Sequence, residues 1–233
     1  MVKLNQTYKE KETLKQYPDI AKIKQNYIDF CLNKAKWNKY GRAYDCSISL
    51  YNIDFKDKIV AELGARDSIF SSYLTQYVKK VHASDIFIGW GDLGDLTYWD
   101  NLWKKFAIEP EKHISEFQDM TRTKYQDDFF DIVVSFSAIE HIPNNGDTLA
   151  AKEMARICKP GEKIIIGTEM IGGENTIWHS GGYFYSEKGL FERIIDPMES
   201  QIIGDYDFSY ENSDKINFNG LEFTSCIFCL EKK

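Results

Sequence analysis

The spacing of apolar positions divides this chain into an N-terminal helical part and a longer part of alternating strands and helices. Residues 8–39 carry apolar side chains at helical spacing, and Pro18 is predicted to break them into two helices. From residue 58 onward, short apolar runs alternate with helical patterns. The predicted strands are 58–63, 81–86, 112–117, 130–137 and 163–168, followed by two more near 200–209 and 221–231. The predicted helices are 67–79, the later part of 89–105, 146–158 and 186–195.

This alternation predicts an α/β fold with a doubly wound, Rossmann-like sheet. The run 130–137 is almost continuously apolar, which is typical of a buried parallel strand. We expect seven strands, mostly parallel with an antiparallel C-terminal strand, and helices on both faces. Residues 1–50 are expected to form a helical extension over the active site, and residues 51–233 the α/β domain. Ligands of such sheets bind at the carboxyl ends of the strands.

Residues of the kind that bind a nucleoside lie at these strand ends. A carboxylate such as Asp85 can accept hydrogen bonds from both hydroxyls of a ribose. Asp85 also follows Gly64 by about twenty residues, as in nucleoside-binding βαβ units. The full set of candidate cofactor residues is Glu62, Gly64, Arg66, Ser68, Asp85, Ile86, Asp119, Met120, Ser135 and Phe136.

In order and spacing, five segments resemble the motifs of class I S-adenosylmethionine-dependent methyltransferases. They are VAELGARDS, HASDIF, FQDM, FFDIVVSFSAIEHIP and EMARICKPGEKIIIG, between about residues 56 and 170. The most similar group methylates small molecules and includes ubiquinone-biosynthesis enzymes. The resemblance implies S-adenosyl-L-methionine as cofactor and makes residues 51–233 a class I methyltransferase domain. It does not extend to the first 50 residues.

The resemblance also implies roles for individual residues. Gly64 would let the backbone approach the methionine part of the cofactor, and Asp85 would hold the ribose. Asp119 would meet the adenine amine, with Met120 beside the ring. The floor of the cofactor site would be lined by Ser135 and Phe136.

The first motif departs from the family at Arg66 and Ser68, where glycines are usual. One interpretation is that Arg66, or the amides of the following helix, binds the cofactor's carboxylate. The other is that Arg66 points to solvent and the turn binds weakly or not at all. The turn after the strand 58–63 is not a G-x-G-x-x-G, which argues against a nicotinamide dehydrogenase, and it does not resemble a P-loop.

Two histidines are the candidates for catalysis. His141 follows the fourth strand, and histidine is the side chain that most readily exchanges protons near neutral pH. His179 lies in a Gly-rich, aromatic loop that is expected to cover the acceptor. The alternative for His141 is a structural role in its loop. No metal site is expected, since helix caps or solvated acids explain Asp92, Asp95 and Asp100 as well as a cation would.

Composition narrows the classes of partner. The net charge of −7 argues against nucleic acid as a partner. No leader or membrane-spanning run is visible, so we expect a cytoplasmic protein that is a monomer or homodimer. Among the five cysteines, Cys226 and Cys229 lie three apart in a predicted strand and should point to opposite faces.

These observations predict an enzyme that methylates an oxygen of a small polar acceptor, such as a sugar, a sugar nucleotide or a phosphorylated intermediate. A precursor destined for a surface glycan belongs to this class of acceptor. Two alternatives stay open. One is a non-catalytic binding module with a degenerate cofactor motif, and the other is a protein methyltransferase.

Overall fold

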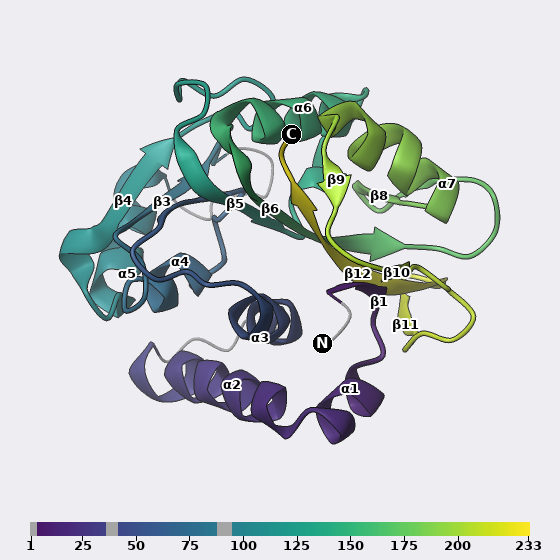
Figure 1. Cartoon of the computed structure of the whole chain (residues 1–233), viewed down its shortest axis with the longest axis horizontal. Coiled ribbons are helices and arrows are strands. Elements are labelled where there is room, and N and C mark those ends of the chain that lie inside the picture. Colours follow the sequence, from purple (N-terminus) through teal and green to yellow (C-terminus); the bar gives the residue numbers. More distant parts are fainter. Residues whose placement is uncertain (1–3, 36–41, 88–94) are drawn as a thin grey trace.

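The computed structural model describes residues 4–35, 42–87 and 95–233. Within these residues, one ten-stranded sheet runs through the centre and helices pack on both of its faces (Figure 1). No helix in the described ranges is both long enough and apolar enough to cross a membrane. The α/β architecture predicted from the sequence is confirmed.

Five parallel strands form the core of the sheet in the order β4-β3-β2-β5-β6. The first strand of the α/β domain, β2, lies in the middle, and the chain changes direction between β2 and β5. All five carboxyl ends therefore lie along one edge, with the switch point at its centre. The strands are β2 (Ile59–Leu63), β3 (Lys80–Asp85), β4 (His113–Phe117), β5 (Phe130–Phe136) and β6 (Cys158–Met170).

The sheet continues past β6 with antiparallel strands. The long strand β12 (Leu221–Glu231) pairs with β6, and β1 (Asn5–Thr7) pairs with the other side of β12. Only two short pieces, β9 (Gln201–Ile202) and β10 (Tyr206–Asp207), form where the sequence predicted a strand near 200–209. The remaining strands are β11 (Ile216–Phe218) and a separate hairpin of β7 (Ile177–His179) and β8 (Gly182–Phe184).

The predicted strand near 200–209 is interrupted because the N-terminal strand takes part of its place beside β12. The side chain of Asn5 accepts a hydrogen bond from the Cys229 N–H at 2.7 Å and donates one to the Ile203 carbonyl at 2.7 Å. It thereby joins β12 to the segment after β9. The sequence analysis missed β1 because three residues give no readable alternation.

Helices cover the two faces unequally (Figure 1). One face carries α2 (Pro18–Asp29), α3 (Ala43–Asn52), α4 (Phe70–Leu74) and α5 (Leu96–Phe106), and the other α6 (Gly146–Ile157) and α7 (Glu187–Leu190). The helix α1 (Glu10–Gln16) precedes α2, and Pro18 is the first residue of α2, as predicted. Short turns of other helix types are Phe30–Lys34, Pro110–Lys112, Ile139–His141, Phe191–Ile195 and Asp196–Met198.

The helix predicted for residues 67–79 is much shorter in the structure, where α4 spans only Phe70–Leu74. The hydroxyl of Thr75 donates to the Ser72 carbonyl at 2.8 Å and accepts from the N–H groups of Ile108 and Glu109, both at 3.1 Å. These bonds tie the end of α4 to the loop after α5. A threonine that bonds to nearby backbone competes with helix continuation.

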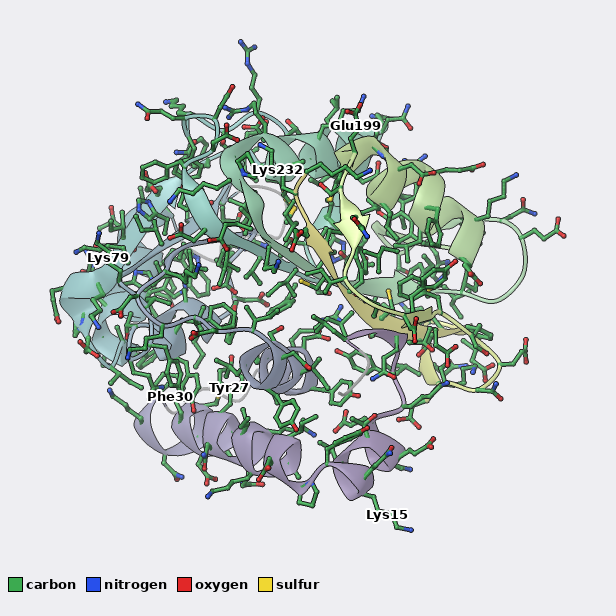
Figure 2. All side chains as sticks on the ribbon, viewed as in Figure 1. Lys15, Tyr27, Phe30, Lys79, Glu199 and Lys232 are labelled. Atoms are coloured by element: carbon green, nitrogen blue, oxygen red, sulfur yellow. The ribbon has the colours of Figure 1, made fainter. Side chains whose placement is uncertain are left out.

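The N-terminal helices pack onto the domain through aromatic side chains. Tyr27 and Phe30 lie at the C-terminal end of α2 and in the turn that follows it (Figure 2). The ring of Tyr27 meets Phe70 with centroids 6.1 Å apart, and Phe30 meets Tyr73 at 5.0 Å. Such edge-to-face and tilted contacts favour a fixed position for α2 over α4.

Two smaller predictions are also confirmed. Cys226 and Cys229 are buried on opposite faces of β12, in different parts of the core. Asp95 caps α5 by accepting from the Tyr98 N–H at 3.1 Å, and Asp100 pairs with Lys104 at 2.9 Å, so both have structural roles. Asp92 lies outside the described residues.

Candidate functional site

The turn after β2 can only be made by a glycine at position 64. Gly64 has φ +74°, and a Cβ on it would lie 2.2 Å from the Cβ of Ala138, in the loop after β5. The N–H groups of Gly64 and Ala65 donate to the Ser84 carbonyl at 2.9 and 3.0 Å. The backbone of the turn is thus held against both neighbouring strands at the switch point.

Glu62, in β2, holds this turn by hydrogen bonds. Its carboxylate accepts from the Ser68 hydroxyl at 2.6 Å and from the Ser71 N–H at 2.8 Å. Burial raises the pKa of Glu62 to about 7, and the bonds from Ser68 and Ser71 oppose that rise. On the outer side, the indole of Trp103 donates to the Ser68 carbonyl at 2.9 Å. Glu62 and Ser68 therefore shape the turn.

Arg66 and Asp85 meet where β2 and β3 end. The Arg66 N–H donates to Oδ2 of Asp85 at 3.3 Å, and the Phe87 N–H donates to Oδ1 at 2.7 Å. Burial raises the pKa of Asp85, and the two N–H donors oppose the rise. The Arg66 side chain is 7 % exposed, and its Nη1 has no hydrogen-bond partner among the described residues. A buried donor of this kind can bind a water molecule or a ligand.

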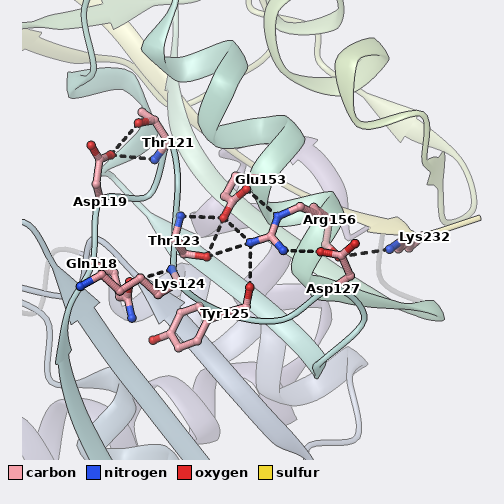
Figure 3. Close-up of polar contacts among 10 residues, drawn as sticks. All are labelled: Gln118, Asp119, Thr121, Thr123, Lys124, Tyr125, Asp127, Glu153, Arg156 and Lys232. Carbon is pink, nitrogen blue, oxygen red and sulfur yellow. Dashed lines mark hydrogen bonds and ion pairs between the residues drawn. The ribbon is translucent and has the colours of Figure 1, made fainter.

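The segment after β4 is fixed by a half-buried ionic network (Figure 3). Glu153 on α6 accepts from the N–H and the hydroxyl of Thr123, both at 2.6 Å. Arg156 donates to Glu153 at 2.8 Å and to the Tyr125 carbonyl at 2.9 Å. At the other end of the segment, Oδ1 of Asp119 accepts from the Thr121 N–H at 2.8 Å. Asp119 is therefore held in place at the strand end.

These strand ends open into one cavity of about 1060 Å³. Of the predicted cofactor and catalytic residues, those that line it are Gly64, Arg66, Ser68, Asp85, Ile86, Asp119, Met120, Phe136 and His141. The other three, Glu62, Ser135 and His179, do not line it. Ser135 is fully buried within β5, and the His179 ring packs against Phe184 with centroids 6.3 Å apart.

The β7–β8 hairpin fixes the orientation of His141. Nδ1 of His141 lies 2.8 Å from the Gly181 carbonyl, so Nδ1 carries the proton that makes this bond. In the neutral imidazole, Nε2 then has the lone pair that can accept a proton. Gly182 allows this approach, since a Cβ there would lie 3.2 Å from Nδ1. The hairpin thus orients a cavity side chain, His141, through its backbone carbonyl at Gly181.

The part of the cavity away from the β2 turn contains charged residues that the sequence analysis missed. Arg42, which immediately precedes α3, and Glu169, near the end of β6, form an ion pair. The Ser225 hydroxyl donates to the other oxygen of Glu169 at 2.7 Å. Tyr8 also lines this region, which we call the acidic end of the cavity, defined by Tyr8, Arg42, Glu169 and Ser225. Glu169 also lies near a strand end. It was not predicted as a site residue because the strand was predicted to end at Thr168, whereas β6 continues to Met170.

Comparison with known proteins agrees with this geometry. A family model described as "Methyltransferase domain" matches residues 61–166. These residues form a class I, S-adenosylmethionine-dependent methyltransferase domain. None of the curated proteins matches the sequence significantly.

Solved structures share the methyltransferase fold at low sequence identity. Geranyl diphosphate C-methyltransferase from Streptomyces coelicolor A3(2) matches with a TM-score of 0.60 and 10 % identity, covering 81 % of this chain and 76 % of that one. A methyltransferase from Mesorhizobium loti gives 0.57 and 10 %, covering 82 % and 98 %. The YcgJ protein of Bacillus subtilis gives 0.56 and 13 %, covering 81 % and 97 %.

The methyltransferase cavity fits its cofactor in three respects. Gly64 leaves the backbone of the turn accessible from the cavity. The Asp85 oxygens each accept one backbone N–H and retain lone pairs for a ribose diol. Nη1 of Arg66, which has no partner among the described residues, is a donor of the kind that can bind the carboxylate of the methionine part.

Proposed function

We propose that this methyltransferase transfers a methyl group to an oxygen of a small polar acceptor, with His141 as the base. The observation that supports the proposal most strongly is that His141, the β2 turn and Asp85 line one cavity. The acceptor would lie between His141 and the acidic end, opposite the cofactor. We propose that the acceptor is a sugar, a sugar nucleotide or another polar metabolite.

S-adenosylmethionine, when bound, supplies an electrophilic methyl group. The sulfonium sulfur that carries this methyl group becomes a neutral thioether when the group is transferred. The protein has to align the acceptor and remove one proton. His141 would take the hydroxyl proton at Nε2 as the C–O bond forms and the C–S bond breaks. The Gly181 carbonyl stabilises the imidazolium through Nδ1–H, because that bond becomes charge-assisted.

We assign the cofactor contacts by position in the cavity. Asp85 binds the ribose, and Asp119 and Met120 contact the adenine. Phe136 would line the floor of the cofactor site, and Arg66 would bind the cofactor's carboxylate, since both line the cavity. Glu62 and Ser68 act indirectly, by holding the turn.

Replacing Arg66 by alanine should weaken S-adenosylhomocysteine binding by about 10–100-fold. The lost interaction is a hydrogen bond to a charged group, which contributes about 1.5–3 kcal/mol. Calorimetric titration measures the change, and decarboxylated S-adenosylhomocysteine is the matched ligand. Wild type and variant should bind that ligand equally. Equal weakening for both ligands would mean that Arg66 supports the turn and does not bind the carboxylate.

The proposed reaction is tested by following the methyl group. Wild-type protein is incubated with S-adenosylmethionine labelled in the methyl carbon and with a filtered extract of small metabolites. The expected result is label in a small product that releases methyl iodide when heated with hydriodic acid, as a methyl ether does. Label in protein would support a protein methyltransferase, and label on nitrogen or carbon would contradict O-methylation.

A further inference from the structure

The acidic end of the cavity and the buried residues behind it contain more carboxyl groups than cationic side chains among the described residues. Nη1 of Arg42 lies 3.3 Å from Asp45, and its Nη2 lies 3.7 Å from Glu140 and pairs with Glu169. One guanidinium thus faces three carboxyl groups. Arg42 is the only Lys or Arg of residues 4–35, 42–87 and 95–233 that pairs with any of them.

Packing keeps the carboxyl groups of Asp45 and Glu140 close to Glu169 and away from solvent. Asp45 is fully buried and Glu140 is 1 % exposed. A Cβ on Gly167 would lie 2.8 Å from Oδ2 of Asp45, so only glycine at this position lets α3 approach β6 closely. Burial raises the pKa of Asp45 to about 6. Burial and the nearby Glu140 also raise the pKa of Glu169, although Arg42 lowers it.

Some oxygens of this group lack a donor. Both carboxylate oxygens of Glu140 have no hydrogen-bond partner within the described part of the chain, and the fully buried Asp45 lies near the hydroxyl of Tyr8. Glu169 lines the cavity and accepts bonds on both oxygens, from Arg42 and Ser225, which leaves each oxygen a further lone pair. Buried carboxylates without enough donors are costly, and a cationic donor from a ligand would relieve that cost.

The walls around the acidic end suit an organic cation. The side chains of Tyr8 and Phe223 line the same cavity next to Ser225, and aromatic faces attract ammonium groups. Arg42 is unsuited to recognising an anion, because both of its terminal nitrogens already face carboxylates. A phosphate or carboxylate placed here would meet like charges.

We propose that the methyl acceptor carries a cationic nitrogen, of the amine or amino-sugar class, and that Glu169 binds this nitrogen at the acidic end of the cavity. The proposal rests on the function proposed above. It narrows the acceptor class and leaves out phosphorylated intermediates. Asp45 and Glu140 add negative potential behind Glu169, and Arg42 holds Glu169 in place.

The test compares three probes of similar shape on full-length protein saturated with S-adenosylhomocysteine. The probes are benzylammonium, benzyl alcohol and benzoate, titrated calorimetrically at neutral pH. We expect benzylammonium to bind at least about tenfold more tightly than benzyl alcohol and benzoate to bind most weakly, since a charge-assisted bond contributes about 1.5–3 kcal/mol. Benzoate binding as tightly as benzylammonium, or no preference among the probes, would overturn the proposal.

Two variants locate the effect. Glu169→Gln keeps the side-chain size and should weaken benzylammonium about tenfold while benzyl alcohol is unchanged. Glu174→Gln, on an exposed loop, is the matched control and should change nothing. Unchanged benzylammonium affinity in Glu169→Gln would contradict the assignment. If Glu169→Gln does not fold, the ranking of the probes on wild type decides alone.

The two proposals fail in different ways. Each probe experiment follows a titration with S-adenosylhomocysteine. If S-adenosylhomocysteine does not bind, the proposed function and this inference are both overturned. Normal S-adenosylhomocysteine binding without a preference for the cation would overturn only the acceptor class.

Discussion

Replacing His141 by asparagine is expected to lower kcat by about 10²–10⁴-fold, which is the usual contribution of a positioned general base. Asparagine can still donate to the Gly181 carbonyl, so the β7–β8 hairpin should keep its place. It cannot accept the hydroxyl proton as imidazole does. The affinity for S-adenosylhomocysteine should therefore remain that of the wild type, and the loss should lie in kcat.

The rate is measured with the acceptor identified by the label-transfer experiment. His179→Asn is the informative partner variant, because the sequence predicts both histidines as catalytic and only His141 lines the cavity. We expect His179→Asn to lower kcat by less than about tenfold. The opposite ranking of the two variants would exclude His141 as the base and return the role to His179.

Replacing Gly64 by alanine is expected to weaken S-adenosylhomocysteine binding by at least about 30-fold. The new Cβ would lie 2.2 Å from the Cβ of Ala138, so the turn and the loop after β5 must move apart. That overlap costs about 1–3 kcal/mol, and the positive φ of +74° costs about 1–2 kcal/mol more. Both the turn and Ala138 line the cavity, so the shift changes the cofactor site directly.

Two controls separate the causes. Gly161 has φ +77°, and a Cβ added to it would have no atom within 4 Å, so Gly161→Ala carries only the backbone cost and should leave cofactor affinity unchanged. Replacing Ala138 by glycine in the Gly64→Ala background removes the overlapping atom and should restore part of the affinity. Wild-type affinity in Gly64→Ala alone would contradict the account of the turn.

The strand-end rule located much of the cavity from the sequence because parallel strands align their carboxyl ends. Gly64, Asp85 and Asp119 each follow a strand with a clear apolar pattern, and all three line the cavity. Glu62 and Ser135 lie within strands, where neighbouring side chains alternate between faces. Glu62 contacts the backbone of the turn and Ser135 is enclosed in the sheet, so neither reaches the cavity.

The acidic end could not be predicted because its residues come together only in three dimensions. Tyr8 is placed by β1, a three-residue strand that exists because β12 offers it an edge. Arg42 immediately precedes α3, in a region that the family resemblance does not cover. Ser225 lies on β12, and its contact with Glu169 depends on the antiparallel register of Ser225 opposite Glu169.

The turn after β2 and Asp85 are expected to bind S-adenosylmethionine although Arg66 and Ser68 stand where glycines are usual. Calorimetric titration of the wild-type protein with S-adenosylhomocysteine tests this expectation most directly, with Asp85→Asn as the paired variant. The account predicts one site with a Kd below about 1 mM, the weak end of ordinary substrate affinities, and weaker binding in Asp85→Asn. No binding at millimolar ligand, or equal binding by Asp85→Asn, would contradict it.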